Sequence, residues 1–137
     1  ICGDNGSIRI NLTVTDPVVS KPGYQASTFT MATVENVAPV VTAEGSDIDE
    51  NGWATVTGTI ADPGAEDTFT VTIDWGDGSD TYDYPAGTTA YSELHQYHNP
   101  TDIYLVTVTV IDDDGGIGTA STYVNVVRVF LPLVLKD

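Results

Sequence analysis

Most residues of this 137-residue chain that could do chemistry are carboxylates, and many of them stand in predicted turns. The chain has 20 Asp and Glu against 4 Lys and Arg, a formal net charge of −16 at pH 7. Oxygen ligands of this kind suit calcium, so cations are natural partners, although a solvated surface also explains many of these charges. Residues 47–52 have the D-x-D-x-N-G spacing that begins an EF-hand loop. Gly58 replaces the closing Glu and a strand pattern follows, so we interpret the loop as an acidic hairpin turn.

Catalytic patterns are absent from the sequence. His95 and His98 could ligate a transition metal, but no third ligand is evident beside them. The sequence contains no G-x-S-x-G, no H-E-x-x-H and no P-loop. Acidic pairs are abundant but fall mainly in turns, so no pair stands out as an acid and base. The sequence therefore predicts a protein that is not an enzyme.

The charge distribution excludes several partners. No Lys or Arg lies between Lys21 and Arg128, and such an acidic block repels phosphate backbones and anionic membrane surfaces. We expect no nucleic acid partner and, since no apolar run is long enough, no membrane span. Cys2 is the only cysteine, which leaves it free or linked to another chain. The chain opens at Ile1 without a signal-peptide pattern, and we interpret it as a piece of something longer.

Alternating apolar residues predict an all-β protein. Thr68–Ile73 is apolar at every second position, which is typical of a half-buried strand. Asp74–Ser79 (D-W-G-D-G-S) then supplies turn residues. Phe69, Val71, Ile73 and Trp75 would share one face, and we expect Trp75 to be a core anchor. Short strands separated by Gly, Pro and Asp clusters favour a sandwich.

Three motifs in order carry a family resemblance. The WGDG turn is followed by His95-Gln96-Tyr97 and then by Y-x-V-T-V-x-V-x-D at Tyr104–Asp112. Over about residues 37–127 this pattern resembles the PKD (polycystic kidney disease) family of Ig-like domains. The resemblance implies an antiparallel Ig-like β-sandwich from a multi-repeat extracellular prokaryotic protein. It also implies that His95 and Tyr97 are structural.

The resemblance also implies a cation site, because some PKD-like domains bind calcium near the domain entry. It places Asn36, Asp62 and Asp112 there, with Asp67 and Asp113 as further ligands. Oxygen ligands from several loops at one end of a sandwich suit calcium. The alternative is that these residues only form turns and that no metal is bound.

An internal repeat divides the chain into three predicted parts. Leu12–Asp16 parallels the segment that ends at Asp112, and Phe29–Val34 parallels Thr122–Val127. Residues 1–36 therefore resemble the last two strands of a preceding copy, ahead of a sandwich at 37–127 and an apolar tail at 128–137. Such repeats indicate domains joined end to end.

Two apolar segments lack an obvious partner, which predicts assembly. One is an alternating row near the N-terminus and the other is the tail. The predicted assembly residues are Ile8, Ile10, Leu12, Val14, Val129, Leu131, Leu133 and Leu135. The tail could fold back as an edge strand of its own domain, or it could complete the unfinished sandwich of a neighbouring chain.

The sequence thus favours a non-catalytic structural module at the cell surface or outside the cell. It would be a surface-protein repeat or a filament subunit that associates with itself or with neighbouring PKD-like repeats, head to tail. The alternative is an accessory module of a secreted hydrolase that binds a polysaccharide or a matrix protein. An exposed aromatic row would favour that alternative, but most aromatics are predicted to face inward. Asn5 and Asn11 lie in N-glycosylation sequons.

Overall fold

The computed structural model describes residues 6–14, 26–100 and 103–127, and all regular elements in these ranges are β-strands. The strands are β1 (Gly6–Val14), β2 (Ala26–Val34), β3 (Val40–Val41), β4 (Glu44–Gly45), β5 (Asp47–Ile48), β6 (Trp53–Ala61), β7 (Phe69–Asp74), β8 (Ser79–Tyr84), β9 (Ala90–Gln96), β10 (Ile103–Asp112) and β11 (Ile117–Val126). Within these ranges no helix is long and apolar enough to cross a membrane.

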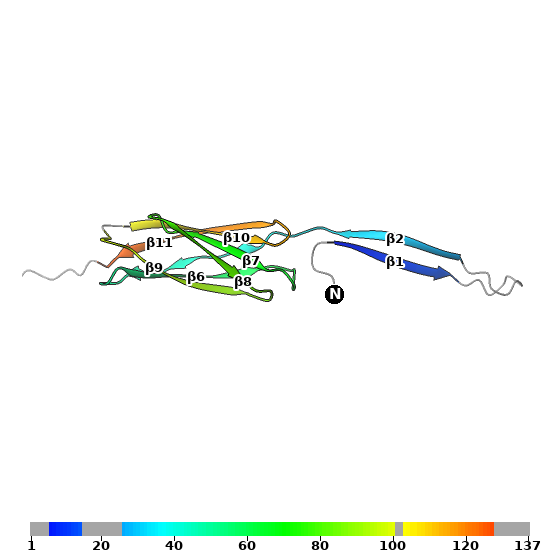
Figure 1. Cartoon of the computed structure of the whole chain (residues 1–137), viewed down its shortest axis with the longest axis horizontal. Coiled ribbons are helices and arrows are strands. Elements are labelled where there is room, and N and C mark those ends of the chain that lie inside the picture. The colour runs from blue at the N-terminus through cyan, green and yellow to red at the C-terminus, as the bar shows by residue number, and fades with distance from the viewer. Residues whose placement is uncertain (1–5, 15–25, 101–102, 128–137) are drawn as a thin grey trace, which may run out of the picture.

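Nine of these strands, β3 to β11, form two facing sheets (Figure 1). One sheet has the order β5-β11-β10-β7-β8, and in the other β6 pairs with β3, β4 and β9. All pairs are antiparallel except the short pair of β5 with β11. The predicted all-β antiparallel sandwich is confirmed. Residues 40–48 contain three two-residue strands, β3 to β5.

The core lies between the two sheets, as alternation predicted. Phe69, Val71, Ile73 and Trp75 face inward and are buried. They meet buried residues of both sheets and of the loops around them: Ile48, Ala54, Val56, Ile60, Tyr91, Tyr97, Val106, Val108, Val110 and Val124. The prediction that Trp75 is a core anchor is confirmed, since its side chain is inaccessible to solvent.

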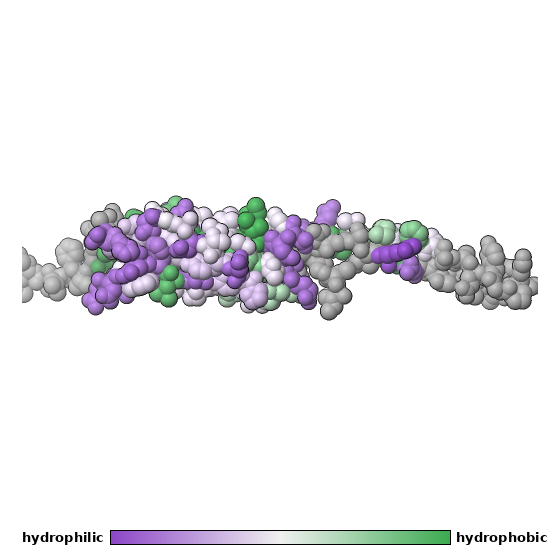
Figure 2. All heavy atoms as spheres, in the orientation of Figure 1, coloured by the Kyte–Doolittle hydropathy of each residue, from purple (hydrophilic) through white to green (hydrophobic). Residues whose placement is uncertain are grey.

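The outer faces of the sheets are rich in threonine. Thr109 lies between Thr119 and Thr72 in the register of the sheet, and Thr72 lies opposite Thr81. Figure 2 shows one side of the molecule, on which hydrophobic residues form only separate spots on a largely hydrophilic sandwich. At the side where the edge strands β8 and β9 approach each other, the Tyr84 hydroxyl donates a hydrogen bond to Glu93.

Strands β1 and β2 form a separate two-stranded hairpin beyond one end of the sandwich (Figure 1). Ile10 pairs with Thr30 in this hairpin, and Val106 pairs with Thr122 in β10–β11. When the first strands are matched as the sequence indicated, Thr30 therefore corresponds to Thr122. The sequence matched Phe29 to Thr122, which differs by one residue from the match of the first strands, because the pairing within each hairpin fixes the second strand once the first is aligned.

With the first strands matched, other residues of the second strands correspond as well. Ala26 takes the place of Gly118, and Met31 takes that of Tyr123. The row Ile8, Ile10, Leu12 and Val14 occupies alternate positions of β1, as the sequence predicted for an apolar face. Val129, Leu131, Leu133, Leu135, Cys2 and Asn5 lie outside the described residues, whereas Asn11 lies exposed in β1.

Candidate metal centre

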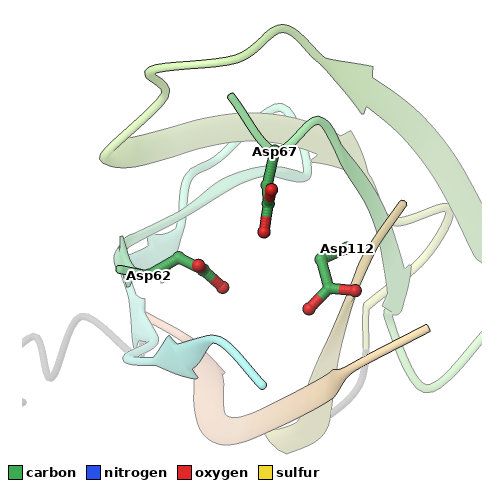
Figure 3. Close-up of side chains that lie close together, drawn as sticks. All are labelled: Asp62, Asp67 and Asp112. Carbon is green, nitrogen blue, oxygen red and sulfur yellow. The ribbon is translucent and has the colours of Figure 1, made fainter. Parts of the chain in front are cut away.

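Three aspartates converge at the end of the sandwich that carries the hairpin. Asp62 follows β6, Asp67 precedes β7 and Asp112 ends β10. One carboxylate oxygen from each lies within 4.8 Å of those of the other two, and the three side chains point toward a common centre (Figure 3). Asp67 and Asp112 are buried, and Asp62 is partly buried.

The loop between β6 and β7 positions two of these carboxylates. Asp62 Oδ1 accepts a hydrogen bond from the Gly64 amide at 2.7 Å, which fixes an Asp-Pro-Gly turn. The Asp67 amide in turn donates to the Gly64 carbonyl at 3.2 Å. A Cβ atom at Gly64 would lie 2.2 Å from an oxygen of Asp67, so only glycine allows this approach.

The turn after β10 positions the third carboxylate. Asp112 Oδ1 accepts hydrogen bonds from the amides of Asp114 at 3.0 Å and Gly116 at 2.7 Å. Gly115 has φ of +92°, a conformation that glycine adopts without strain. The Asp-Asp-Asp-Gly-Gly sequence therefore forms the turn and also places the Asp112 carboxylate in the cluster, so the two interpretations of Asp112 are compatible.

Asn36 brings the segment after β2 to the same place. Its Nδ2 lies 3.1 Å from each oxygen of Asp112 and donates to them. Its Oδ1 is buried and has no hydrogen-bond partner among the described residues. A 180° rotation of this amide would exchange the two atoms, and amide oxygen is a calcium ligand whereas amide nitrogen is not.

Asp113, the fifth predicted ligand, lies elsewhere. It is exposed, and its Oδ1 accepts a hydrogen bond from the Thr68 amide at 3.0 Å. This contact ties the β10–β11 turn to the start of β7. The structure thus brings together Asn36, Asp62, Asp67 and Asp112, and it gives Asp113 a neighbouring structural contact.

The electrostatics and spacing of the group suit a divalent cation. Three carboxylates in a partly dehydrated place repel one another unless a positive charge compensates them, and residues 37–127 contain no Lys or Arg. Calcium takes oxygen ligands at 2.3–2.6 Å, so two ligands of one ion lie at most about 5 Å apart. The observed separation of up to 4.8 Å is within that limit.

The histidine motif forms a second polar cluster, around the WGDG turn. His95 Nε2 lies 2.9 Å from Asp77 Oδ1, and its Nδ1 lies 3.6 Å from Asp80 Oδ2. The His95 ring stacks on Trp75 with centroids 4.8 Å apart, and the Tyr97 hydroxyl donates to the Trp75 carbonyl. The sequence did not predict acidic partners for His95, because Asp77 of the WGDG turn and Asp80 of β8 come close to it only in the fold.

The fold and these motifs define an Ig-like antiparallel sandwich of the PKD type. The chain is similar to a solved structure, the PKD domain of an M14-like peptidase from a Thermoplasmatales archaeon. The TM-score is 0.54 at 20% sequence identity, over 69% of this chain and 100% of that domain. No protein-family model and no curated protein matches the chain. The likeness shows that the two proteins share a fold.

Proposed function

We propose that this chain is a non-catalytic structural module of an extracellular or cell-surface protein, built from PKD-like repeats joined head to tail. The observation that carries the proposal is that, when β1 is matched to β10, the pairing of each hairpin places Thr30 where Thr122 stands and Ser27 where Thr119 stands. Two copies of one strand pair along a single chain are typical of a domain array. PKD domains are usually extracellular, which supports the location outside the cell.

We further propose that β1–β2 is completed by strands of a neighbouring unit. In the sandwich, β10 pairs with β7 as well as with β11. Among the described residues, β1 pairs only with β2, and an isolated two-stranded hairpin is marginally stable in water. An added strand would satisfy the open edge of β1, and strands of the neighbouring unit packed across its face would cover the row that contains Ile10.

The apolar segment Val129–Leu135 is the proposed donor of such a strand. A heterologous contact of this kind does not close on itself and generates a filament. Deletion of Val129–Asp137 should therefore abolish filaments seen by electron microscopy and leave folded monomers. Filaments that survive the deletion, or a full chain that forms none, would contradict strand donation.

Calcium is the proposed cofactor of the module. Carboxylate oxygens of Asp62, Asp67 and Asp112 and the amide oxygen of Asn36 would hold it. The convergence of the three carboxylates and the buried Asn36 Oδ1 support the site. Bound calcium would neutralise the carboxylates and link the segment after β2 to the end of β10.

One observation favours the alternative of an accessory binding module of a secreted hydrolase. Trp53 is 41% exposed at the start of β6, and the exposed Leu94 lies diagonally across from it on β9. An exposed Trp can stack on a sugar ring or pack on a matrix protein. Co-sedimentation with insoluble polysaccharides and with collagen tests this function. Binding that Trp53→Ala abolishes would support it, and no binding would reject it.

A further inference from the structure

Three large apolar side chains lie together on the outer face of β10–β11. Leu105 and Tyr123 are direct cross-strand partners, and Ile103 lies two positions from Leu105 on the same face. Each of the three is more than half exposed. Farther along the same face, Thr107 opposite Ser121 continues the hydroxyl-rich surface. We call Ile103, Leu105 and Tyr123 the β10–β11 patch.

Carboxylates flank the β10–β11 patch on both sides. Asp74 lies opposite Thr107, which places it diagonally from Leu105 on the same face. Asp47 lies opposite Asn125, two positions along β11 from Tyr123. Both aspartates are exposed, and the sandwich supplies no Lys or Arg to pair with them. The β10–β11 patch is therefore an apolar surface with exposed carboxylates on both sides.

The hairpin β1–β2 carries the complementary chemistry on one of its faces. Arg9 lies opposite Met31, and Phe29 lies on the same face, opposite Asn11. The Arg9 guanidinium carbon lies 4.1 Å from the centroid of the Phe29 ring, and Phe29 and Met31 are each more than half exposed. Arg9 is the only Lys or Arg among the described residues. We call Arg9, Phe29 and Met31 the hairpin outer face.

The two surfaces occupy equivalent places in the repeat. With the registers matched, Arg9 and Met31 stand where Leu105 and Tyr123 stand in β10–β11. Exposed apolar side chains therefore recur on the same face of both strand pairs, but only the first copy carries a cation. Arg, Met, Phe and Tyr are also the residues that are enriched in protein interfaces and their hot spots.

We propose that the hairpin outer face of one copy of this chain docks on the β10–β11 patch of a second copy. Phe29 and Met31 would cover Leu105 and Tyr123, and Arg9 would face the flanking aspartates. This contact uses the face of the hairpin opposite to the row that contains Ile10, so it is separate from strand donation. The contact involves few side chains, so one copy of it is weak. It becomes strong only where many copies of the contact form in one assembly.

Sedimentation of two complementary variants of the full chain tests this docking. One variant, Arg9→Glu with Met31→Thr, disables the hairpin outer face, and the other, Leu105→Ser with Tyr123→Ser, disables the β10–β11 patch. We expect each variant alone to associate at least tenfold more weakly than the parent chain. An equimolar mixture should regain association, as heterodimers, because each variant keeps one intact surface.

Controls separate this docking from other associations. Val40→Thr changes an exposed apolar residue of β3 outside both surfaces and should leave the association constant unchanged, and circular dichroism melts check that each variant folds. If a double variant unfolds, the single substitutions Arg9→Gln and Tyr123→Ser replace it in the same mixing experiment. A parent chain that does not associate, variants that associate like the parent, a mixture that regains nothing, or an equal loss in Val40→Thr would overturn the proposal.

Discussion

The hairpins β1–β2 and β10–β11 are antiparallel strand pairs with a similar alternation of residues but different surroundings. The inner row of β10, which includes Val106 and Val108, is buried against the second sheet. Its counterpart in β1 includes Ile10, which is about half exposed. An alternating pattern specifies which face of a strand pair is apolar, but it does not supply the surface that covers that face. The proposed function therefore makes β1–β2 dependent on a partner, whereas β10–β11 has one in its own domain.

The largest expected effect concerns the core that covers β10–β11. Trp75→Ala should destabilise the sandwich by roughly 3–5 kcal/mol, because it removes a fully buried aromatic side chain. Phe29→Ala is the control, since Phe29 is exposed on the hairpin and should change the free energy of unfolding by less than about 0.5 kcal/mol. Chemical denaturation measures both values. Similar values for the two variants would remove the distinction between the hairpins.

Calcium should stabilise the end of the sandwich that adjoins β1–β2. At calcium concentrations about 100 times the dissociation constant, a single site adds about 2.7 kcal/mol to stability. We therefore expect chelation to lower the melting temperature of the parent chain. Asp67→Asn and Asp112→Asn should abolish the difference, and Asp113→Asn is the matched control that should keep it. Identical melting with calcium and with chelator would reject the site.

A matched pair of truncations compares equivalent positions of the two hairpins. Val106→Ala should cost roughly 2 kcal/mol, because it removes two buried methyl groups and leaves a cavity. Ile10→Ala removes more carbon atoms, yet in the dilute monomer it should cost less than about 0.5 kcal/mol. Thermal melts of the two variants at low protein concentration give the comparison. An equal or larger cost for Ile10→Ala would mean that β1 is already covered within a single chain.

The last effect is a loss of stability that appears only at alkaline pH. Burial raises the pKa of Tyr91 to about 12, above the value near 10 expected in the unfolded chain. The unfolded state then loses its proton first, so this contribution to stability is present below pH 10 and is lost as the pH rises toward 12. Tyr91→Phe, in urea titrations between pH 9 and 12, should show a shallower loss than the parent chain. An identical slope would show that Tyr91 does not carry the effect.

The sequence predicted the parts of the molecule that depend on local patterns. Period-2 alternation identified the row from Phe69 to Trp75 and the facing row of β10, because a half-buried strand must alternate. The resemblance to PKD domains predicted a group of five residues, of which Asn36, Asp62, Asp67 and Asp112 do come together and Asp113 does not. Spacing alone could not have shown this, since Asp112 comes from a turn far along the sequence from the loop that carries Asp62 and Asp67.

Features that depend on contacts between distant segments were missed. The parallel pairing of β5 with β11 depends on how residues 44–48 cross between the sheets. Asp77 of the WGDG turn lies beside His95. Asp113 accepts a hydrogen bond from the Thr68 amide and does not join the other carboxylates. The exposure of Trp53 depends on its place at the start of β6. None of these features has a periodic signature in the sequence.

Hydrogen exchange on the full chain tests most directly the claim that β1–β2 is completed by a neighbouring unit. The backbone amides of β1 and β2 should exchange rapidly in the dilute monomer and become protected in the assembled state, because an added strand and burial slow their opening. The amides of β10 and β11 should be strongly protected in both states and serve as the internal reference. Equal protection of the two hairpins in the dilute monomer, or no gain in β1–β2 on assembly, would contradict the claim.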